Sequence, residues 1–249
     1  MKNLAPLILF FSLLFALPPK AVAQQPKTAD AQSSYDNGSY ITAAELYENQ
    51  IAAGDTSNPY LYYNLANSYF KAGDPDKAII NYYRAFKLLP RDKDIRGNLA
   101  FALADTGQRL TPEGVPATAF NLYHFFSLGE LKGLMWAGLW LFAFALMFFV
   151  LSDRKVLGKK LLIIAAILTV FFGGWHLLRL PSESKRLAVV VAPRAEVRSG
   201  PGDSFVVSLN VPRAHLVSII DSKGDWAQVE VNSQAQGSGW VLKNTIEEI

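Results

Sequence analysis

Apolar positions change their spacing twice along the chain, and each change predicts a different kind of structure. From residue 30 to about residue 105, apolar side chains recur every three or four positions, the spacing of amphipathic helices. Two nearly unbroken apolar runs follow, at residues 133–151 and 161–178. Beyond Pro181, apolar and polar residues alternate in short runs, as in β-strands. The sequence therefore predicts a helical region, a pair of long apolar helices and a small all-β region.

The helical region contains an internal repeat. The tripeptide Asn-Leu-Ala at residues 64–66 recurs at residues 98–100, about 34 residues later, which is the period of a tetratricopeptide repeat. Between Pro59 and Asp92, apolar and small side chains fall on one face of each of two short helices. Residues 73–75, Gly-Asp-Pro, supply the turn between these helices.

This unit resembles the tetratricopeptide repeat (TPR) family at almost every signature position, namely Tyr62, Leu65, Ala66, Tyr69, Ala78, Tyr82, Ala85 and Pro90. Residues 30–51 look like a degenerate preceding repeat, and residues 94–103 look like the first helix of a third. We therefore expect residues 24–109 to form an all-α TPR domain of two repeats and a capping helix.

The two apolar runs are each long enough to cross a membrane. Their lengths of about 19 and 18 residues lie near the minimum for crossing the hydrocarbon core. They predict transmembrane helices at residues 131–151 and 161–180, preceded by a linker at 110–130. The loop between them, residues 152–160, has one acid, Asp153, and four cations, which are Arg154, Lys155, Lys159 and Lys160. By the positive-inside rule this loop lies in the cytoplasm.

Residues 1–23 have the pattern of a secretory signal peptide. Lys2 precedes an apolar run at residues 4–17, and two prolines then lead to the small-residue site Ala21-Val22-Ala23. An uncleaved anchor helix is the alternative, but a run of about 14 residues is shorter than the roughly 20 that a spanning helix needs. With two further crossings, both termini are expected on the periplasmic side of a multi-pass protein in the bacterial inner membrane.

The pattern beyond residue 186 predicts a small β-barrel. Five β-rich runs separated by turn residues predict its strands, at residues 187–191, 205–209, 215–220, 226–231 and 239–242. The segments AEVRSGP at 195–201, GDW at 224–226 and GWV at 239–241 resemble the bacterial SH3-like (SH3b) family in order and spacing, over residues 186–249. That family commonly has a turn glycine where this chain has Arg213-Ala214, so the geometry of that loop stays open.

Composition removes several classes of function. The chain of 249 residues has no cysteine, which excludes disulfides, thiolate metal sites and lipid attachment through an N-terminal cysteine. Its formal charge of +3 comes from scattered lysines and arginines, without a basic stripe that alternates with aromatic residues, so nucleic-acid binding is not expected. The hydrophobic share of 51% is concentrated in the unbroken apolar runs, which again indicates a partner lipid bilayer.

The sequence has no group of residues suited to catalysis. His124, His176 and His215 lie in separate regions, and none has a triad or metal-ligand spacing. The segments GDPD at 73–76 and GPGD at 200–203 lack the full set of ligands of a calcium or phosphate loop, so they read as turns. We therefore predict a protein that is not an enzyme, with no catalytic residue, no metal and no cofactor.

Two groups of residues are candidates for binding. One helix face differs from the packing face and carries Tyr63, Asn67, Phe70 and Lys71. The TPR resemblance implies that this face lines a groove for a protein partner; the alternative is that Tyr63 and Phe70 pack against the neighbouring repeat. The SH3b resemblance makes Trp226 and Trp240 a second candidate ligand site, and the alternative is that both rings form the core of a small barrel.

The order of the modules resembles the BatE-type TPR proteins of the Bacteroides aerotolerance operon. The resemblance implies an inner-membrane scaffold that acts alongside von Willebrand-type membrane proteins and a MoxR-type ATPase in envelope or oxidative-stress fitness. One alternative is a cell-wall sensor or anchor that binds peptidoglycan through its SH3b domain. A regulated hydrolase is a third class, which the lack of a catalytic constellation disfavours.

Overall fold

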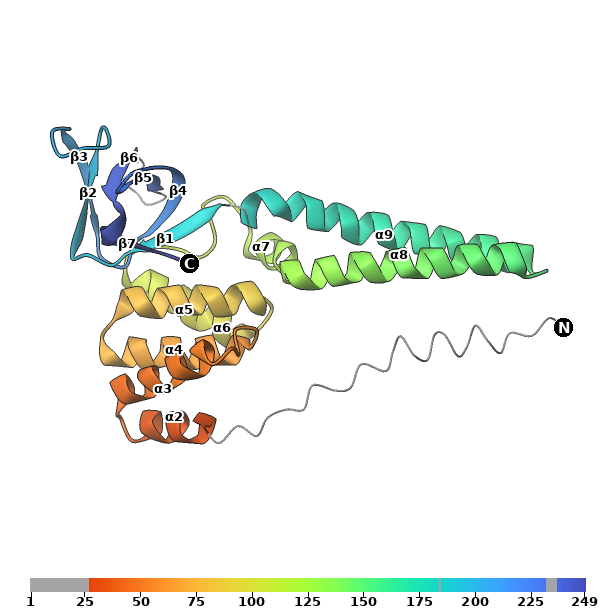
Figure 1. Ribbon diagram of the computed structural model, residues 1–249, viewed down its shortest axis with the longest axis horizontal. Helices are drawn as coiled ribbons and strands as arrows, with labels where there is room; N and C mark the ends of the chain where they lie inside the picture. Colours follow the sequence, from red (N-terminus) through yellow and green to blue (C-terminus); the bar gives the residue numbers. More distant parts are fainter. Residues whose placement is uncertain (1–26, 184, 232–236) are drawn as a thin grey trace.

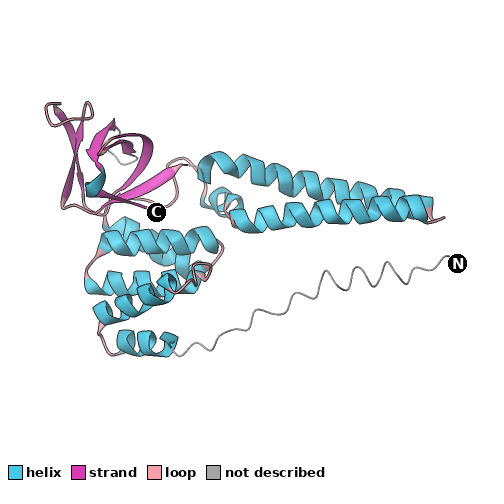
Figure 2. Ribbon diagram, in the orientation of Figure 1, coloured by secondary structure: helices cyan, strands magenta, loops and turns pink. Residues whose placement is uncertain are grey.

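The computed structural model describes residues 27–183, 185–231 and 237–249. The expected signal peptide at residues 1–23 lies outside these ranges. Figure 1 shows three parts: a stack of short helices, a β-sheet above the stack, and a long hairpin of two helices that points away from both. Figure 2 shows the same division by secondary structure, with helices in the stack and the hairpin and strands in the sheet.

Five helices form the stack, and each packs against the next one in sequence. They are α2 (Lys27–Asp36), α3 (Tyr40–Ala52), α4 (Pro59–Ala72), α5 (Pro75–Leu88) and α6 (Lys93–Asp105). Six alanines in these helices are fully buried, and their small side chains let the helix axes approach closely; they are Ala31, Ala43, Ala66, Ala78, Ala85 and Ala102. The stack consists of two helix pairs followed by α6, which is the TPR-like arrangement that the sequence predicts.

Local signals explain where these helices begin and end. The Asn58 side chain accepts a hydrogen bond from the Tyr60 N–H at 3.1 Å, and Pro59 occupies the first helical position of α4. At the other end, Gly73 has φ +83°, a left-handed conformation that favours glycine, and Pro75 begins α5. The helix-to-helix turn thus consists of Gly73 and Asp74, and residues 75–76 of the expected turn already belong to α5.

A short helix and a long hairpin follow the stack. Helix α7 (Ala117–Tyr123) lies in the expected linker, and α8 (Leu128–Leu151) and α9 (Lys155–Glu183) form the hairpin. Helix α8 begins with a capping box, in which Ser127 and Glu130 each accept a hydrogen bond from the other's backbone N–H. Both long helices are long and apolar enough to cross a membrane.

The turn of the hairpin is shorter than expected. The sequence predicts a loop at residues 152–160, but α9 already begins at Lys155. Lys155 Nζ donates hydrogen bonds to the carbonyl oxygens of Phe149 at 2.7 Å and Val150 at 3.0 Å, and so caps the end of α8. The prediction counted only apolar residues as helical, whereas lysines are good helix formers and extend α9 beyond its apolar part.

Seven strands form one antiparallel sheet in the order β3-β2-β6-β5-β4-β1-β7. They are β1 (Arg186–Val190), β2 (Arg194–Arg198), β3 (Val207–Pro212), β4 (Leu216–Lys223), β5 (Trp226–Val231), β6 (Gly237–Leu242) and β7 (Ile246–Glu248), with the 3-10 helix η1 (Lys243–Thr245) before β7. Strands β3 and β7 are the two ends of this order, so the sheet is not closed.

The expectation of a five-stranded barrel is therefore corrected to an open sheet of seven strands. The prediction missed β2 and β7. In β2, the apolar residues Ala195 and Val197 alternate with three charged residues, so its apolar content is too low to stand out. Strand β7 has only three residues, two of them acidic, and its place is set by pairing with β1.

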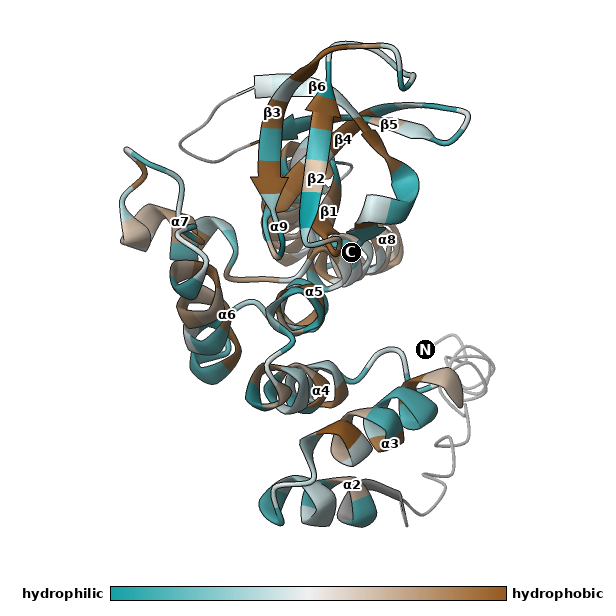
Figure 3. Ribbon diagram, turned by 90° about the vertical axis from the view of Figure 1, so that its left-hand side faces the viewer, coloured by the Kyte–Doolittle hydropathy of each residue, from teal (hydrophilic) through white to brown (hydrophobic). Residues whose placement is uncertain are grey.

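The sheet is packed onto the helical stack. It lies over α5 in Figure 1 and in the perpendicular view of Figure 3. Strand β1 is buried on both faces: Ala188 and Val190 belong to the core inside the sheet, whereas Val189 belongs to the core of the helices. The helices and the sheet thus share a continuous apolar contact, although they are far apart in sequence.

Candidate functional site

Tyr63 and Asn67 on α4 join a hydrogen-bond network that links three helices. Asn67 Oδ1 accepts hydrogen bonds from the Tyr82 hydroxyl of α5 at 2.6 Å and from Asn98 Nδ2 of α6 at 3.0 Å. Asn98 Nδ2 also donates to the Tyr63 hydroxyl at 3.1 Å. Burial raises the pKa of Tyr82, so its hydroxyl stays protonated and remains a donor.

This network fixes the orientation of the Asn67 amide. The atom that receives two donors must be the amide oxygen, so the Nδ2 group is the one that points away from Tyr82 and Asn98. Within the described residues Asn67 Nδ2 makes no hydrogen bond, and it is not a buried atom without a partner. It is therefore a donor that is open to a ligand.

Phe70 and Lys71 extend this face toward the end of α4. The Phe70 ring contacts the Phe101 ring of α6 edge to face, with centroids 5.7 Å apart, and Phe101 is 63% exposed. Lys71 is exposed and has no ion-pair partner among the described residues. We call this face the α4–α6 surface; it consists of Tyr63, Asn67, Phe70, Lys71, Asn98 and Phe101.

Tyr63 and Phe70 contact Asn98 and Phe101 of α6, which is the expected capping helix and not the degenerate repeat of the packing alternative. Lys71 and the Asn67 amide nitrogen remain accessible. Sequence reasoning missed Asn98 and Phe101. Asn98 could have been found, because it begins the second copy of the Asn-Leu-Ala tripeptide, whose first copy begins at Asn64.

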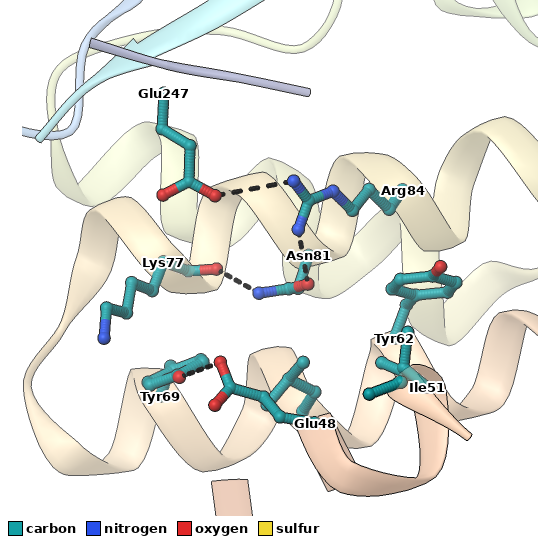
Figure 4. A pocket seen from close by; sticks show the side chains of 10 residues that line it. Glu48, Ile51, Tyr62, Tyr69, Lys77, Asn81, Arg84 and Glu247 are labelled. Atoms are coloured by element: carbon teal, nitrogen blue, oxygen red, sulfur yellow. Dashed lines mark hydrogen bonds and ion pairs between the residues drawn. The ribbon is translucent and has the colours of Figure 1, made fainter. Parts of the chain in front are cut away.

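A cavity of about 290 Å³, which shares no lining residue with the α4–α6 surface, lies among the helices (Figure 4). Helices α3, α4 and α5 line it, together with Glu247 of β7. Its charged groups are already occupied. The Tyr69 hydroxyl donates to Glu48 Oε1 at 2.5 Å, and Lys77 Nζ lies 4.8 Å from the centre of the Tyr69 ring. Arg84 Nη2 lies 3.4 Å from Glu247 Oε1.

A ligand in this cavity would have to compete with these internal pairs. Burial, and then the hydrogen bond to Glu48, raise the pKa of Tyr69, so that hydroxyl stays a donor committed to the carboxylate. The cavity therefore offers fewer open groups than the α4–α6 surface. The sequence gives no signal for it, because Glu247 reaches it only through the packing of the sheet on α5.

The sheet is attached to the stack by polar contacts around the turn between β3 and β4. Arg213 Nη2 lies 3.0 Å from Asp74 Oδ1 and 2.7 Å from Asp76 Oδ1, and the Asp76 side chain is 3% exposed. Gln108, which follows α6, donates to the Ala214 carbonyl oxygen at 3.0 Å and accepts from the Leu216 N–H at 2.8 Å. These contacts fix the sheet in one position on α5 and α6.

Ala214 resolves the turn that the sequence left open. It adopts φ +65°, the left-handed conformation that glycine accepts more readily than alanine. Its side chain is 1% exposed and belongs to the core of the helices, while its N–H donates to the Val190 carbonyl oxygen at 2.8 Å. The methyl group that makes this conformation less favourable is thus buried in the contact between sheet and stack.

Trp226 and Trp240 lie on the face of the sheet opposite its core. Trp226 pairs with Leu242, and Trp240 pairs with Gln228 and Arg198. The buried residues of the same two strands are Ala227, Val229, Val231 and Val241. Both tryptophans are only partly buried and belong to neither core, which consists of small aliphatic residues at this point. They are diagonal neighbours on one accessible face.

The three histidines occupy unrelated surroundings. The His124 ring lies against Phe120, with centroids 4.2 Å apart, His176 lies within α9, and His215 Nδ1 is 3.2 Å from the Arg213 carbonyl oxygen. Across the described ranges, no three histidine, aspartate or glutamate side chains gather in a way that could hold a metal ion. The structure therefore brings the candidate residues together only at the α4–α6 surface and at the tryptophan face.

The geometry of α4 and α5 agrees with a known family. Residues 59–92, which span these two helices, match the tetratricopeptide repeat family. No curated protein matches the chain. Among solved structures, the chain is similar to the Yersinia enterocolitica type III secretion chaperone SycD, whose crystal structure is a complex with a peptide of the translocator YopD. That similarity has 15% identity, covers 60% of this chain and 91% of the chaperone, and has a TM-score of 0.32, too low to support an inference of function.

Proposed function

We propose that the protein is a membrane-anchored adaptor that binds a segment of a partner protein on the α4–α6 surface. The TPR match points to a role in protein–protein interaction. One observation carries the choice of surface: Asn67 Nδ2 and Lys71 are accessible donors one helical turn apart on α4. The exposed Phe101 ring contacts Phe70, which lies on the same face of α4 as these two donors.

The chemistry of this surface defines the partner. Two donors, one of them cationic, favour a carboxylate or a pair of carbonyl groups. The Phe70–Phe101 pair offers an apolar contact beside them. The partner is therefore a protein segment that carries an acidic residue next to an apolar one, and the hydrogen-bond network of Tyr63, Tyr82 and Asn98 holds the Asn67 amide ready to meet it.

The hairpin serves as the membrane anchor in this proposal. The stack and the sheet lie together at one end of the hairpin, and the short turn with its cations lies at the other (Figure 1). Two crossings with a basic turn fit an inner-membrane protein whose soluble parts both face the periplasm. The order of modules supports a BatE-type scaffold that acts with von Willebrand-type membrane proteins and a MoxR-type ATPase system, without enzymatic activity of its own.

Reporter fusions test this topology. Alkaline phosphatase fused after Arg109 or after Ile249 is expected to be active, because the enzyme matures only outside the cytoplasm. A fusion at Asp153, in the turn of the hairpin, is expected to be inactive. Phosphatase activity in whole cells is the measurement, and fusion protein levels are the control. An inactive fusion after Ile249 would contradict two crossings.

Charge reversal at Lys71 tests the binding surface. Lys71→Glu is expected to weaken copurification of the partner from native membranes in mild detergent by at least about tenfold, because it replaces an attractive contact by a repulsive one. Lys93→Glu is the matched control, since Lys93 is also exposed but lies at the start of α6. Equal partner recovery with both variants would place the interaction elsewhere.

A cell-wall sensor is the second candidate function, favoured by the outward-facing tryptophans. Aromatic rings on an accessible face can bind a ligand such as a peptidoglycan fragment without a change in the core. Changing both Trp226 and Trp240 to Ala is expected to leave the sheet folded, because neither ring belongs to its core. Loss of binding of this double variant to purified wall sacculi would support the sensor. If the same variant also lost the partner in copurification, the sensor would become the main function.

A further inference from the structure

The turn of the hairpin carries positive charge that the described part of the chain does not neutralise. Lys155 is committed to the carbonyl oxygens at the end of α8. The side chains of Arg154 and Lys160 are exposed, and neither has a hydrogen-bond or ion-pair partner among the described residues. Asp153, the acid of this turn, is not paired with either of them within the same ranges.

These cations line a cavity of about 440 Å³ that also has an apolar side. Its lining residues are Asp153, Arg154, Lys155, Val156, Leu157 and Lys160. Val156 is 74% exposed and Leu157 is 43% exposed. Close by, Leu151 at the end of α8 is 71% exposed. A ligand that fits this cavity must therefore present negative charge and hydrocarbon side by side.

We propose that this cavity binds the headgroup of an anionic phospholipid, with the phosphate between Arg154 and Lys160 and the acyl chains along the apolar sides of α8 and α9. Free phosphate shares the anionic chemistry, but it would leave Val156 and Leu157 facing water. A lipid covers both, and basic residues next to membrane helices attract anionic lipids. This site rests on the proposed membrane placement of the hairpin, which puts the turn at the cytoplasmic leaflet.

Native mass spectrometry of the full chain in detergent micelles tests the site. The protein is titrated with phosphatidylglycerol, which is anionic, and with phosphatidylcholine, which is zwitterionic. The parent chain is expected to retain phosphatidylglycerol at least about tenfold more tightly than phosphatidylcholine. The double variant Arg154→Gln, Lys160→Gln is expected to bind phosphatidylglycerol roughly 10- to 30-fold more weakly, since each cation near the lipid surface contributes to the attraction.

A matched control removes the same charge at the other end of the hairpin. Lys132→Gln combined with Lys185→Gln changes two exposed lysines near the soluble parts, and it is expected to leave the affinity within about twofold of the parent. The proposal is overturned if the double variant at the turn binds like the parent, or if the control loses as much affinity. Displacement of the lipid by millimolar inorganic phosphate would also overturn it, because free phosphate would then be the ligand.

Alkaline carbonate extraction of the parent chain from cell membranes tests the membrane placement separately. A chain that carbonate removes would refute the anchor, whatever the lipid titration shows. A chain that resists extraction but binds both lipids equally would keep the anchor and refute the headgroup site. The two proposals can thus fail independently.

Discussion

Replacing Ala66 by phenylalanine is expected to lower the free energy of unfolding of the helical stack by about 1–3 kcal/mol, the usual result of overpacking a core. Ala66 is 0% exposed and lies on α4, which packs against α3 on one side and α5 on the other. A benzyl group at this position must push at least one of these helices away. A short array has little stability in reserve, because each repeat is stabilised mainly by its neighbours.

Hydrogen exchange of the α4 and α5 amides in the full chain measures this loss. Ala104→Phe is the matched control, because Ala104 is exposed on α6 and the added ring meets solvent. The control is expected to stay within about 0.5 kcal/mol of the parent. Parent-like protection of α4 and α5 in the Ala66 variant would show that the helices do not pack closely at this residue.

Replacing Arg213 by methionine is expected to destabilise the stack and the sheet together, by about 1–3 kcal/mol. The Asp76 carboxylate is almost fully buried and would lose the cation that lies 2.7 Å away. Because the Arg213 side chain is itself 41% exposed, the loss stays below that of a fully buried ion pair. Methionine keeps most of the side-chain volume, so the effect reports on charge.

The measurement is hydrogen exchange at α5 and at β4 in the same sample. Arg194→Met is the control, because Arg194 is exposed at the start of β2 and its side chain has no hydrogen-bond or ion-pair partner among the described residues. If the double variant Asp76→Asn, Arg213→Met recovers the lost stability, the uncompensated carboxylate is the cause of the loss. Reduced protection of β4 alone would mean that sheet and stack unfold as separate units.

Most helices of the stack could be predicted because their signals are local. Pro59 and Pro75 mark the beginnings of α4 and α5, and Gly73 marks the turn between them. The Asp92 side chain accepts hydrogen bonds from the N–H groups of Asp94 and Ile95 at 2.9 and 3.0 Å, which fixes the start of α6. Such signals depend only on residues within one turn of a helix.

The contact between sheet and stack could not be predicted, because it depends on residues far apart in sequence. Treating the helices and the sheet as separate modules gives no reason for Ala214 to be buried among helices or for Gln108 to bond to β4. Strand β1 is an unbroken apolar run after Arg186, and both of its faces are covered. The run is consistent with burial on two faces, but it does not identify α5 as the element that covers the second one.

Sequence and structure contribute different parts of the candidate site. Helical spacing placed Tyr63, Asn67 and Lys71 on one face, and in the structure Tyr63 and Asn67 share Asn98 as a hydrogen-bond donor while Lys71 is exposed. Spacing does not reveal which atoms are already engaged, so the role of Asn98 in orienting the Asn67 amide was missed. The tryptophans show the same limit, because ring size predicts burial whereas strand register decides the face.

Strand β1 has a mechanical consequence for the connection between the hairpin and the soluble parts. Helix α9 ends at Glu183 and β1 begins at Arg186, so the second long helix and the sheet are close together in sequence. At the same end of the hairpin, Arg91 Nη1 lies 2.6 Å from Glu130 Oε2 and holds the stack to the start of α8. A piston movement of α9 relative to α8 would therefore shear β1 against α5. Force applied by a bound partner would pass to the hairpin through these two connections, from β1 to α9 and from Arg91 to Glu130.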